Sequence, residues 1–318
     1  MQPVPPDQRL GLVSGGEHFV ARSNRGARQE AAKAAAALRR QQQQQRRKRF
    51  VWAGTAVGVV VIVVLALVLV KVVGGGSKPN AQPAATAPPQ VVQAVTAVPA
   101  GVLDQVALGK VDTLPKAISG QPALTDGGKP LVVYVGAEYC PFCAAQRWGM
   151  VVALSRFGTF TGLKTTQSAS QDVFPNTATL SFHGSTYTSD FLTFQGVETQ
   201  SNVRQGNTYA PLDTLTAQQT QLLNTYNAPP FVPAGAIPFI DFGNKFLISG
   251  ASISPQLLAG KSAQDIAAAL SDPANPIAQA VDGSANAFTA AICQLTGGQP
   301  GAVCSSTAVT AYQGKLGG

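Results

Sequence analysis

A run of residues without a single charge, Phe50–Val70, most constrains what this chain of 318 residues can become. As an α-helix the run spans about 32 Å, the thickness of the hydrocarbon core of a bilayer. It is too long for a buried core helix in a domain of this size. The sequence therefore predicts one transmembrane helix, over residues 50–73.

The basic residues of the chain gather before this run. Residues 1–49 carry 11 Lys or Arg against 3 Asp or Glu, whereas residues 72–318 carry 11 against 12. Because positive residues that flank a membrane helix stay in the cytoplasm, the cluster Arg46–Arg49 predicts an N-terminus inside and a C-terminal domain outside. The cluster can also contact membrane lipid, so the basic tail does not indicate a nucleic-acid partner.

A cleaved signal peptide is the competing interpretation of the same segment. Its basic region would be 49 residues long and its apolar run 21, and both exceed the lengths of a normal signal peptide. A membrane anchor that stays attached to the chain fits these lengths better.

Composition divides the chain into five parts. After the membrane helix comes a stretch rich in Gly, Ala and Pro, which is typical of a linker. The predicted parts are a cytoplasmic tail that is disordered and then helical (1–49), the membrane helix (50–73), the linker (74–97), an extracytoplasmic domain (98–306) and a C-terminal tail (307–318).

The outer domain shows an α/β order of elements. A continuous β-branched run predicts a buried strand, and alternating apolar residues around His183 and Gly184 predict a hairpin. The predicted elements are a strand (131–135), a helix (140–157), a hairpin (179–197), a helix (216–226), a hairpin (239–248) and two helices (262–270 and 276–295).

The pair Cys140 and Cys143 carries the candidate chemistry. Cys140 opens the predicted helix, where free N–H groups and the helix dipole stabilise a thiolate. Cys143 follows one turn later on the same face, so it can attack a mixed disulfide formed on Cys140. Pro141 suits the first helical turn, where its missing N–H is not needed.

Two other roles for this pair are weaker. A zinc site needs four ligands, and the chain has no second C-x-x-C motif. A purely structural disulfide between adjacent turns closes almost no loop and adds little stability. Neither a metal nor a cofactor is therefore expected.

The segment Lys129–Cys143 resembles the strand, turn and active-site helix of the thioredoxin superfamily. That family has a central mixed sheet flanked by helices, and a cis-proline before a β-hairpin faces its dithiol. Pro238 stands before the predicted hairpin, so the resemblance implies a cis Ile237–Pro238 bond and a place for Pro238 in the active site. A trans proline that starts a strand is the alternative.

A second resemblance covers residues 98–306. It is to an uncharacterised domain-of-unknown-function family, number 929, of prokaryotic membrane proteins with a thioredoxin-like core. The segments that carry it are Tyr139–Trp148, Ala153–Phe160, Tyr187–Asp190 and Ala290–Cys293. It supports the fold more than an activity.

One position departs from the thioredoxin pattern. Many thioredoxins carry a buried acid six residues before the first cysteine, and this chain has Tyr134 there. Glu138 is a possible proton acceptor in its place, although a solvated turn residue is the simpler interpretation. We expect Trp148 to pack in the core and His183 to belong to a turn rather than to act as a ligand or base. Arg147 could raise the local positive potential behind the cysteines, although a solvated or ion-paired face is the simpler interpretation.

Cys293 and Cys304 lie near the end of the chain. Thiols outside the cytoplasm tend to oxidise, so these two predict a structural disulfide that holds the tail. A relay pair that exchanges with Cys140 is the alternative.

The sequence thus predicts a membrane-anchored thiol–disulfide oxidoreductase. Its partners would be exported proteins with thiols or disulfides and a redox partner in the membrane or envelope. The other hypothesis is a thioredoxin-fold envelope module without enzymatic activity, which binds a partner or senses redox state.

Overall fold

The computed structural model describes residues 83–316. The largest sheet in this part of the chain is built around one strand. Strand β4 (Lys129–Gly136) pairs in parallel with β9 (Thr193–Glu198) and antiparallel with β12 (Phe239–Phe242). Strand β13 (Phe246–Ser249) pairs with β12, so the sheet is mixed. Two short strands complete it, β2 (Lys116–Ala117) beside β13 and β3 (Thr125–Asp126) beside β4.

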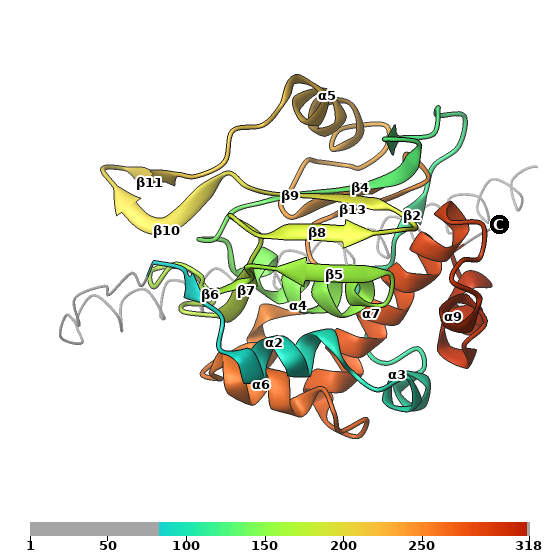
Figure 1. Cartoon of the computed structure of the whole chain (residues 1–318). Helices are drawn as coiled ribbons and strands as arrows, with labels where there is room; N and C mark the ends of the chain where they lie inside the picture. Colours follow the sequence, from blue (N-terminus) through green and yellow to red (C-terminus); the bar gives the residue numbers. More distant parts are fainter. Residues whose placement is uncertain (1–82, 317–318) are drawn as a thin grey trace, which may run out of the picture. The chain divides into compact units, whose positions relative to one another are not determined.

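Alternate residues of β4 face two separate cores, because successive side chains of a strand point to opposite faces of the sheet. Helix α5 (Ala217–Tyr226) covers one face, and α4 (Pro141–Ser155) with α7 (Pro276–Leu295) covers the other (Figure 1). The β4 residues in the first core are Leu131, Val133 and Val135, and those in the second are Val132 and Tyr134.

This arrangement confirms an α/β fold with a central mixed sheet flanked by helices. Helices α4, α5 and α7 lie where the sequence predicts helices, and β12 and β13 form the predicted hairpin. Helix α6 (Ala263–Ala269) also lies where a helix is predicted, and other helices on the α4 side of the sheet include α3 (Ala100–Val106), η1 (Pro255–Leu258) and α8 (Gly301–Cys304).

The hairpin predicted over residues 179–197 is wrong. Strand β7 (Ala178–Ser181) pairs with β6 (Lys164–Gln167), and β8 (Thr186–Ser189) pairs with β5 (Gly158–Thr161). An alternating pattern identifies a strand but not its partner, and the partners here come from the preceding segment. Strand β1 (Ala85–Thr86) extends the β6–β7 sheet, and β10 (Gln200–Gln205) pairs with β11 (Thr208–Pro211) in a hairpin of its own.

The folded domain starts earlier than the sequence predicts. The predicted linker, residues 74–97, includes helix α2 (Pro89–Thr96), which packs against α4 and α6. Val91 and Val95 point into the larger core and are buried. The segment around this helix is rich in Ala and Pro, which is typical of a linker. Only two side chains of the helix are fully buried, so its apolar pattern is too weak to predict a helix.

The folded domain also ends later than predicted. The predicted tail, residues 307–318, includes helix α9 (Thr307–Gln313), which packs against α7 and α3. Ala308, Val309 and Tyr312 are buried there, and the Tyr312 hydroxyl donates a hydrogen bond to the Leu108 carbonyl. These buried contacts place the segment within the domain.

The predicted cytoplasmic tail and membrane helix lie outside the described residues. Among residues 83–316, none of the helices combines the length and the apolar character of a membrane-spanning segment. The topology predicted for the chain stays a prediction.

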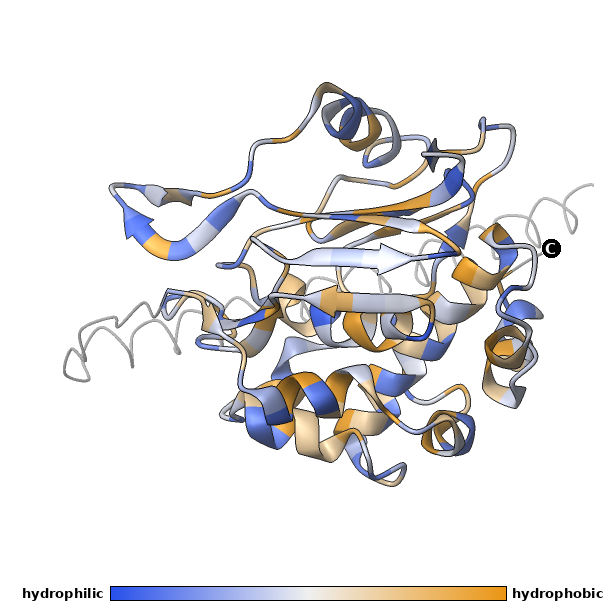
Figure 2. Ribbon diagram, in the orientation of Figure 1, coloured by the Kyte–Doolittle hydropathy of each residue, from blue (hydrophilic) through white to orange (hydrophobic). Residues whose placement is uncertain are grey.

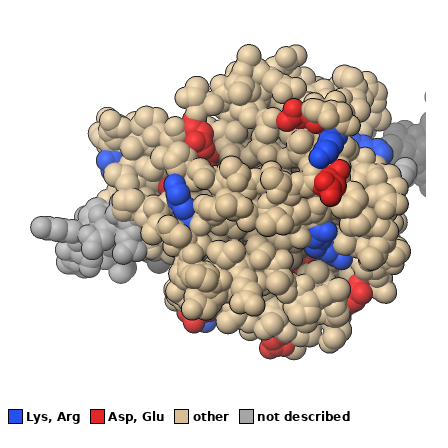
Figure 3. Space-filling model, viewed as in Figure 1, with Lys and Arg blue, Asp and Glu red and all other residues tan. Residues whose placement is uncertain are grey.

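The face of the domain in Figure 3 carries scattered charge. On the face in Figure 3, Lys and Arg alternate with Asp and Glu and do not gather into a basic patch. Figure 2 shows hydrophobic colours along the helices behind the sheet, whereas the β10–β11 hairpin, which projects at the left, is mostly hydrophilic. The hairpin therefore extends from the domain without adding to its core.

A buried carboxyl group on α7 makes the stability of the domain depend on pH. Asp282 is fully buried, neither of its carboxylate oxygens has a hydrogen-bond partner among the described residues, and burial raises its pKa to about 8. The folded chain therefore keeps this proton at pH values where the unfolded chain has lost it. The resulting stability is complete below about pH 4 and is lost as the pH rises towards about 8.

We expect the free energy of unfolding to fall by about 1 kcal/mol per pH unit between roughly pH 5 and pH 7 because of Asp282. Asp282→Asn removes this contribution, which urea denaturation at several pH values will measure. Asp241, whose pKa burial raises to about 7, contributes a second part that the variant leaves in place. An unchanged slope in Asp282→Asn would contradict the assignment.

A disulfide joins Cys293, near the end of α7, to Cys304, at the end of α8, with their Cα atoms 5.6 Å apart. Closing a loop of this length stabilises a chain by about 3 kcal/mol in the loop-entropy account. We expect the double variant Cys293→Ser/Cys304→Ser to lose about 2–3 kcal/mol in urea denaturation. Unchanged reactivity of Cys140 in this variant would favour a structural role, and its loss would favour a relay.

Candidate functional site

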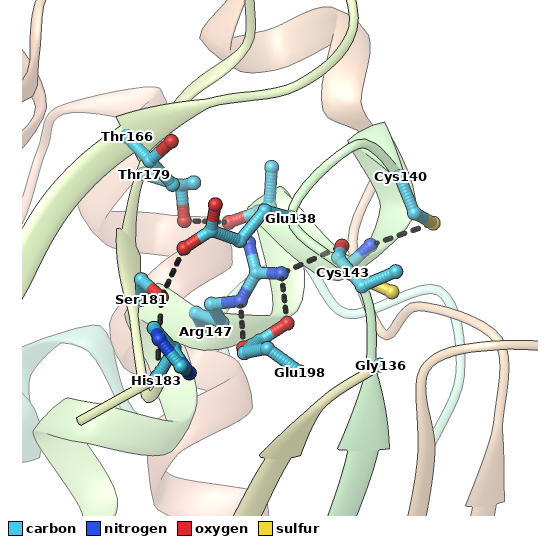
Figure 4. Close-up of polar contacts among 12 residues, drawn as sticks. Gly136, Glu138, Cys140, Cys143, Arg147, Thr166, Thr179, Ser181, His183 and Glu198 are labelled. Atoms are coloured by element: carbon cyan, nitrogen blue, oxygen red, sulfur yellow. Dashed lines mark hydrogen bonds and ion pairs between the residues drawn. The ribbon is translucent and has the colours of Figure 1, made fainter. Parts of the chain in front are cut away.

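The two free cysteines of the described residues lie at the start of α4 (Figure 4). Strand β4 ends at Gly136, a short turn follows, and Cys140 is the N-cap of the helix. The backbone N–H of Cys143 donates to the Cys140 sulfur over 3.3 Å. A side chain at the N-cap position normally accepts such a bond, and here the acceptor is the sulfur itself.

The loop before β12 lies against Cys140. The Ile237–Pro238 peptide bond is cis, and the Cys140 thiol lies 3.8 Å from the Ile237 carbonyl oxygen, to which it donates. Three segments that are distant in sequence therefore meet at one sulfur. They are the end of β4, the start of α4 and the proline loop.

The two thiols differ in access and in acidity. Cys140 retains 6% of its surface and Cys143 none, so Cys140 is less open than the sequence suggests. The hydrogen bond from Cys143 lowers the pKa of the Cys140 thiol, burial opposes this, and Arg147 lowers the pKa further. Burial raises the pKa of the Cys143 thiol well above its usual range, and the bond to Cys140 adds to this effect. The structure thus separates one acidic thiol from one protected thiol.

A buried ion pair lies behind the dithiol. Arg147 stands one helical turn after Cys143, and its Nε and Nη2 atoms each donate to a carboxylate oxygen of Glu198 over 2.7 Å. Both side chains are fully buried. Nη2 also donates to the Ala137 carbonyl, in the turn that leads to Cys140. The expected ion-paired face of Arg147 therefore exists, but inside the protein and not at its surface.

Glu138 is buried and not solvated, which corrects the simpler interpretation of this residue. The Ser181 hydroxyl, at the end of β7, donates to a Glu138 carboxylate oxygen over 2.6 Å. Figure 4 shows the Glu138 carboxylate on the Arg147 side of the turn, away from the Cys143 sulfur. The hydrogen bond to Glu138 comes from Ser181 and not from Cys143, so a role of Glu138 in proton transfer stays a hypothesis.

Tyr134 occupies the position where many thioredoxins have an acid. Its side chain is fully buried, its hydroxyl has no hydrogen-bond partner among the described residues, and burial raises its pKa well above the usual range. Its ring meets the Phe182 ring edge to face, at 5.0 Å between centroids. Tyr134 is therefore a neutral core residue, and it cannot serve as a base near neutral pH.

A mostly apolar hollow of about 370 Å³ is lined by Phe142, two residues after Cys140, and by Ile237, whose carbonyl accepts the hydrogen bond from the Cys140 thiol. Phe142, between the two cysteines, is 40% exposed and forms one wall, and Ile237 forms another. The Phe142 ring also meets Phe174 edge to face, at 5.8 Å between centroids. The other lining residues are Asp112, Ala236, Gly250, Ala251, Ile253 and Ser254.

Comparison with known families gives one match. The model of the family described as Domain of unknown function (DUF929) matches residues 117–294, more than half of the chain. The chain belongs to the DUF929 family. No curated protein and no solved structure matches the chain significantly.

The DUF929 match includes the whole dithiol site. Cys140, Cys143, Arg147, Glu198 and Pro238 all fall within it. The description of the family assigns no activity, so the chemistry of the site has to be argued from its geometry.

His183 of this DUF929 chain belongs to a turn after β7, and it also pairs with a carboxylate. Its Nδ1 lies 2.7 Å from an Asp213 oxygen, and the other Asp213 oxygen accepts the backbone N–H of Glu198. The pair thereby supports the end of β9, where Glu198 stands. Among residues 83–316, no group of three or more His, Cys, Asp or Glu side chains could hold a metal ion.

The core position expected for Trp148 is where the structure places it. The side chain is buried, and its indole N–H donates to the Ala178 carbonyl over 3.1 Å.

Glu198 is the site residue that sequence reasoning missed. The available signal was the position of Arg147 four residues after Cys143, which puts a cation on the same face of α4 and calls for a buried partner.

Proposed function

We propose that this DUF929 chain is a membrane-anchored thiol–disulfide oxidoreductase with a thioredoxin-like fold, which acts on cysteines of exported proteins. The observation that carries the proposal is the environment of Cys140. Its sulfur caps a helix, accepts the Cys143 N–H, and lies against the carbonyl before a cis-proline. A thiolate stabilised in this way is a good attacking and leaving group.

The arrangement of the sheet supports the thioredoxin-like part of the proposal. The strand before the dithiol, β4, lies between a parallel neighbour, β9, and the antiparallel hairpin β12–β13. The helix that carries the dithiol covers one face of this sheet with α7, and α5 covers the other. This is the layout that the resemblance to thioredoxins implies.

The exchange reaction needs only the two thiols and a substrate disulfide. The Cys140 thiolate attacks one substrate sulfur, the substrate disulfide breaks, and a mixed disulfide forms while one substrate thiolate leaves. Cys143 then loses its proton and attacks the Cys140 sulfur. The Cys140–Cys143 disulfide forms, and the second substrate thiolate leaves and takes up a proton. The substrate gains two electrons, the protein loses two, and the reverse sequence oxidises a substrate.

The hollow beside Cys140 supports a peptide as substrate. Most of its lining residues are apolar, with Asp112 and Ser254 as the polar ones, and Ile237 is among them. An extended chain laid across Cys140 can place an apolar side chain there and pair its backbone with the proline loop. Such recognition depends little on sequence, which suits an enzyme that acts on many exported proteins.

Insulin reduction and refolding of scrambled ribonuclease test the proposal. We expect the full chain to catalyse at least one of these reactions and the Cys140→Ser variant to catalyse neither. Equal rates for the two proteins would overturn the proposal.

The non-enzymatic alternative has one observation in its favour. The position of the usual buried acid holds Tyr134, and its hydroxyl contacts no partner among the described residues. A dithiol without a proton acceptor can still report redox state through oxidation. Failure of both assays, with reversible oxidation of Cys140 and Cys143, would favour this sensing module.

The proposed location is testable separately. Because the cluster Arg46–Arg49 is expected to stay in the cytoplasm, the C-terminal domain should lie outside the membrane. We expect protease added to intact spheroplasts to remove that domain, with detergent lysis as the control for cleavage. Protection in intact spheroplasts but not after lysis would reverse the orientation and the class of substrate with it.

A further inference from the structure

The buried ion pair of Arg147 and Glu198 is an expensive way to stabilise a core, because both charges lose their hydration. Moving two charges out of water is expensive, and well-packed apolar residues in their place are often as stable or more stable. Both side chains here are fully buried, and the bidentate bonds join α4 to the end of β9. A stable core at this position could be built without charge.

The third hydrogen bond of Arg147 connects the pair to the dithiol turn. Nη2 reaches the Ala137 carbonyl, three residues before Cys140. Nη1 is buried and has no hydrogen-bond partner among residues 83–316. Glu198 thus holds the guanidinium through Nε and Nη2, whereas the N–H groups of Nη1 remain without an acceptor among these residues.

The charged and titratable groups around Cys143 come from every element packed at this point. Helix α4 supplies a cation, whereas β4, β9 and the turn between β4 and α4 supply only neutral or acidic groups. They are Arg147 and Cys140 on α4, Tyr134 on β4, Glu198 on β9, and Glu138 and Tyr139 in the turn.

We propose that Arg147 is a positioning residue for Cys143: Glu198 fixes the guanidinium, and its buried positive charge stabilises the Cys143 thiolate that resolves the mixed disulfide. The inference rests on the proposed function. Its physical basis is that a charge acts strongly on a neighbouring thiolate in a site without water. Burial and Cys140 raise the pKa of Cys143, Arg147 lowers it, and Glu198 raises it by less than Arg147 lowers it, so the ion pair as a whole acts in the direction that this role requires.

The step that Arg147 assists is the second half of the exchange. The proton leaves the Cys143 sulfur, the electron pair of that sulfur forms the bond to Cys140, and the bond between Cys140 and the substrate breaks. The leaving substrate thiolate then takes up a proton. No further oxidant or reductant is needed. The species that Arg147 stabilises is the Cys143 thiolate.

Dithiobis(nitrobenzoate) separates the two halves of the reaction on the reduced full chain. Attack by Cys140 releases one coloured thiolate, and resolution by Cys143 releases the second. In the double variant Arg147→Met/Glu198→Gln, which removes both charges, we expect the first phase to slow much less than the second, because the hydrogen bonds from Cys143 lower the pKa of Cys140 more than Arg147 does. We expect its second phase to slow about 10-fold near pH 7 and its pH midpoint to rise by about one unit.

The single variants test the sign of the effect. Glu198→Gln leaves the positive charge without its partner, so we expect the pH midpoint of the second phase to fall. Arg147→Lys keeps the charge, and its midpoint should stay near that of the unaltered chain. A loss of structure alone would slow the second phase in all variants without opposite pH shifts.

Arg156 provides a matched control. It lies at the other end of α4 and donates to Asn286, Thr289 and Ser306, so Arg156→Met also removes a partly buried guanidinium from the same helix. We expect both phases to be unchanged. A second phase that keeps its rate and midpoint in the double variant, or that slows equally in Arg156→Met, would overturn the inference. A missing first phase in the unaltered chain would instead overturn the proposed function.

Discussion

Cells that carry the Cys143→Ser variant are expected to accumulate disulfide-linked complexes between this chain and exported proteins. Cys140 can still attack a substrate, but the sulfur that releases the substrate is gone. The complexes should appear as reductant-sensitive bands of high mass on gels run without reductant. Mass spectrometry of these bands would identify the substrates and the redox partner together.

The matched control for this experiment is Cys140→Ser. It keeps Cys143, which is fully buried and whose pKa burial raises, so it should form no complexes. The double serine variant sets the background. Equal complexes in Cys140→Ser and Cys143→Ser would contradict the assignment of Cys140 as the attacking thiol.

Alkylation of the reduced full chain near neutral pH is expected to label Cys140 about 100-fold faster than Cys143. The thiolate is the reactive species, and the structure lowers the pKa of Cys140 while it raises that of Cys143. Access acts in the same direction, since Cys140 alone of the two retains exposed surface. Quenched iodoacetamide labelling with peptide mass spectrometry gives both rates from one sample.

Urea provides the control for the alkylation experiment. In the unfolded chain the two thiols should react at similar rates, because the helix and the core no longer distinguish them. If Cys143 is the faster thiol in the folded chain, the enzymatic proposal has to be abandoned, and only the α/β fold remains.

The local signals of the sequence predicted much of the fold. The run that forms β4, the capped helix α4, and the hairpin of β12 and β13 each follow from a pattern within about 20 residues. Thr216 of the predicted helix over 216–226 is the N-cap of α5, with a capping box to Gln219. Such elements are specified by residues close in sequence, so a single sequence is enough to predict them.

The remaining parts depend on partners that are distant in sequence. Strands β7 and β8 were identified as strands, but their pairing with β6 and β5 is decided by segments that carry weak patterns. Helix α2 resembles a linker in composition, and α9 resembles a tail. Both become structure because buried side chains meet a core assembled from the rest of the chain.

The residues of the candidate site also fall into two groups, those that a local pattern predicts and those that a distant partner determines. The C-x-x-C spacing and the proline before a hairpin pointed to Cys140, Cys143 and Pro238. Glu198 stands 51 residues after Arg147, and only the parallel pairing of β9 with β4 brings the two together. A single sequence contains no signal for that distance.

The packing of α4 on α7 has a consequence for the order in which the molecule can mature. The dithiol is made well before the helix that supports its back, Pro276–Leu295. Domains tend to fold during synthesis only as far as their contacts are available. A nascent chain therefore carries its two thiols without the core that protects Cys143 until α7 has been made, and the environments of the two sulfurs differ only once that helix has packed.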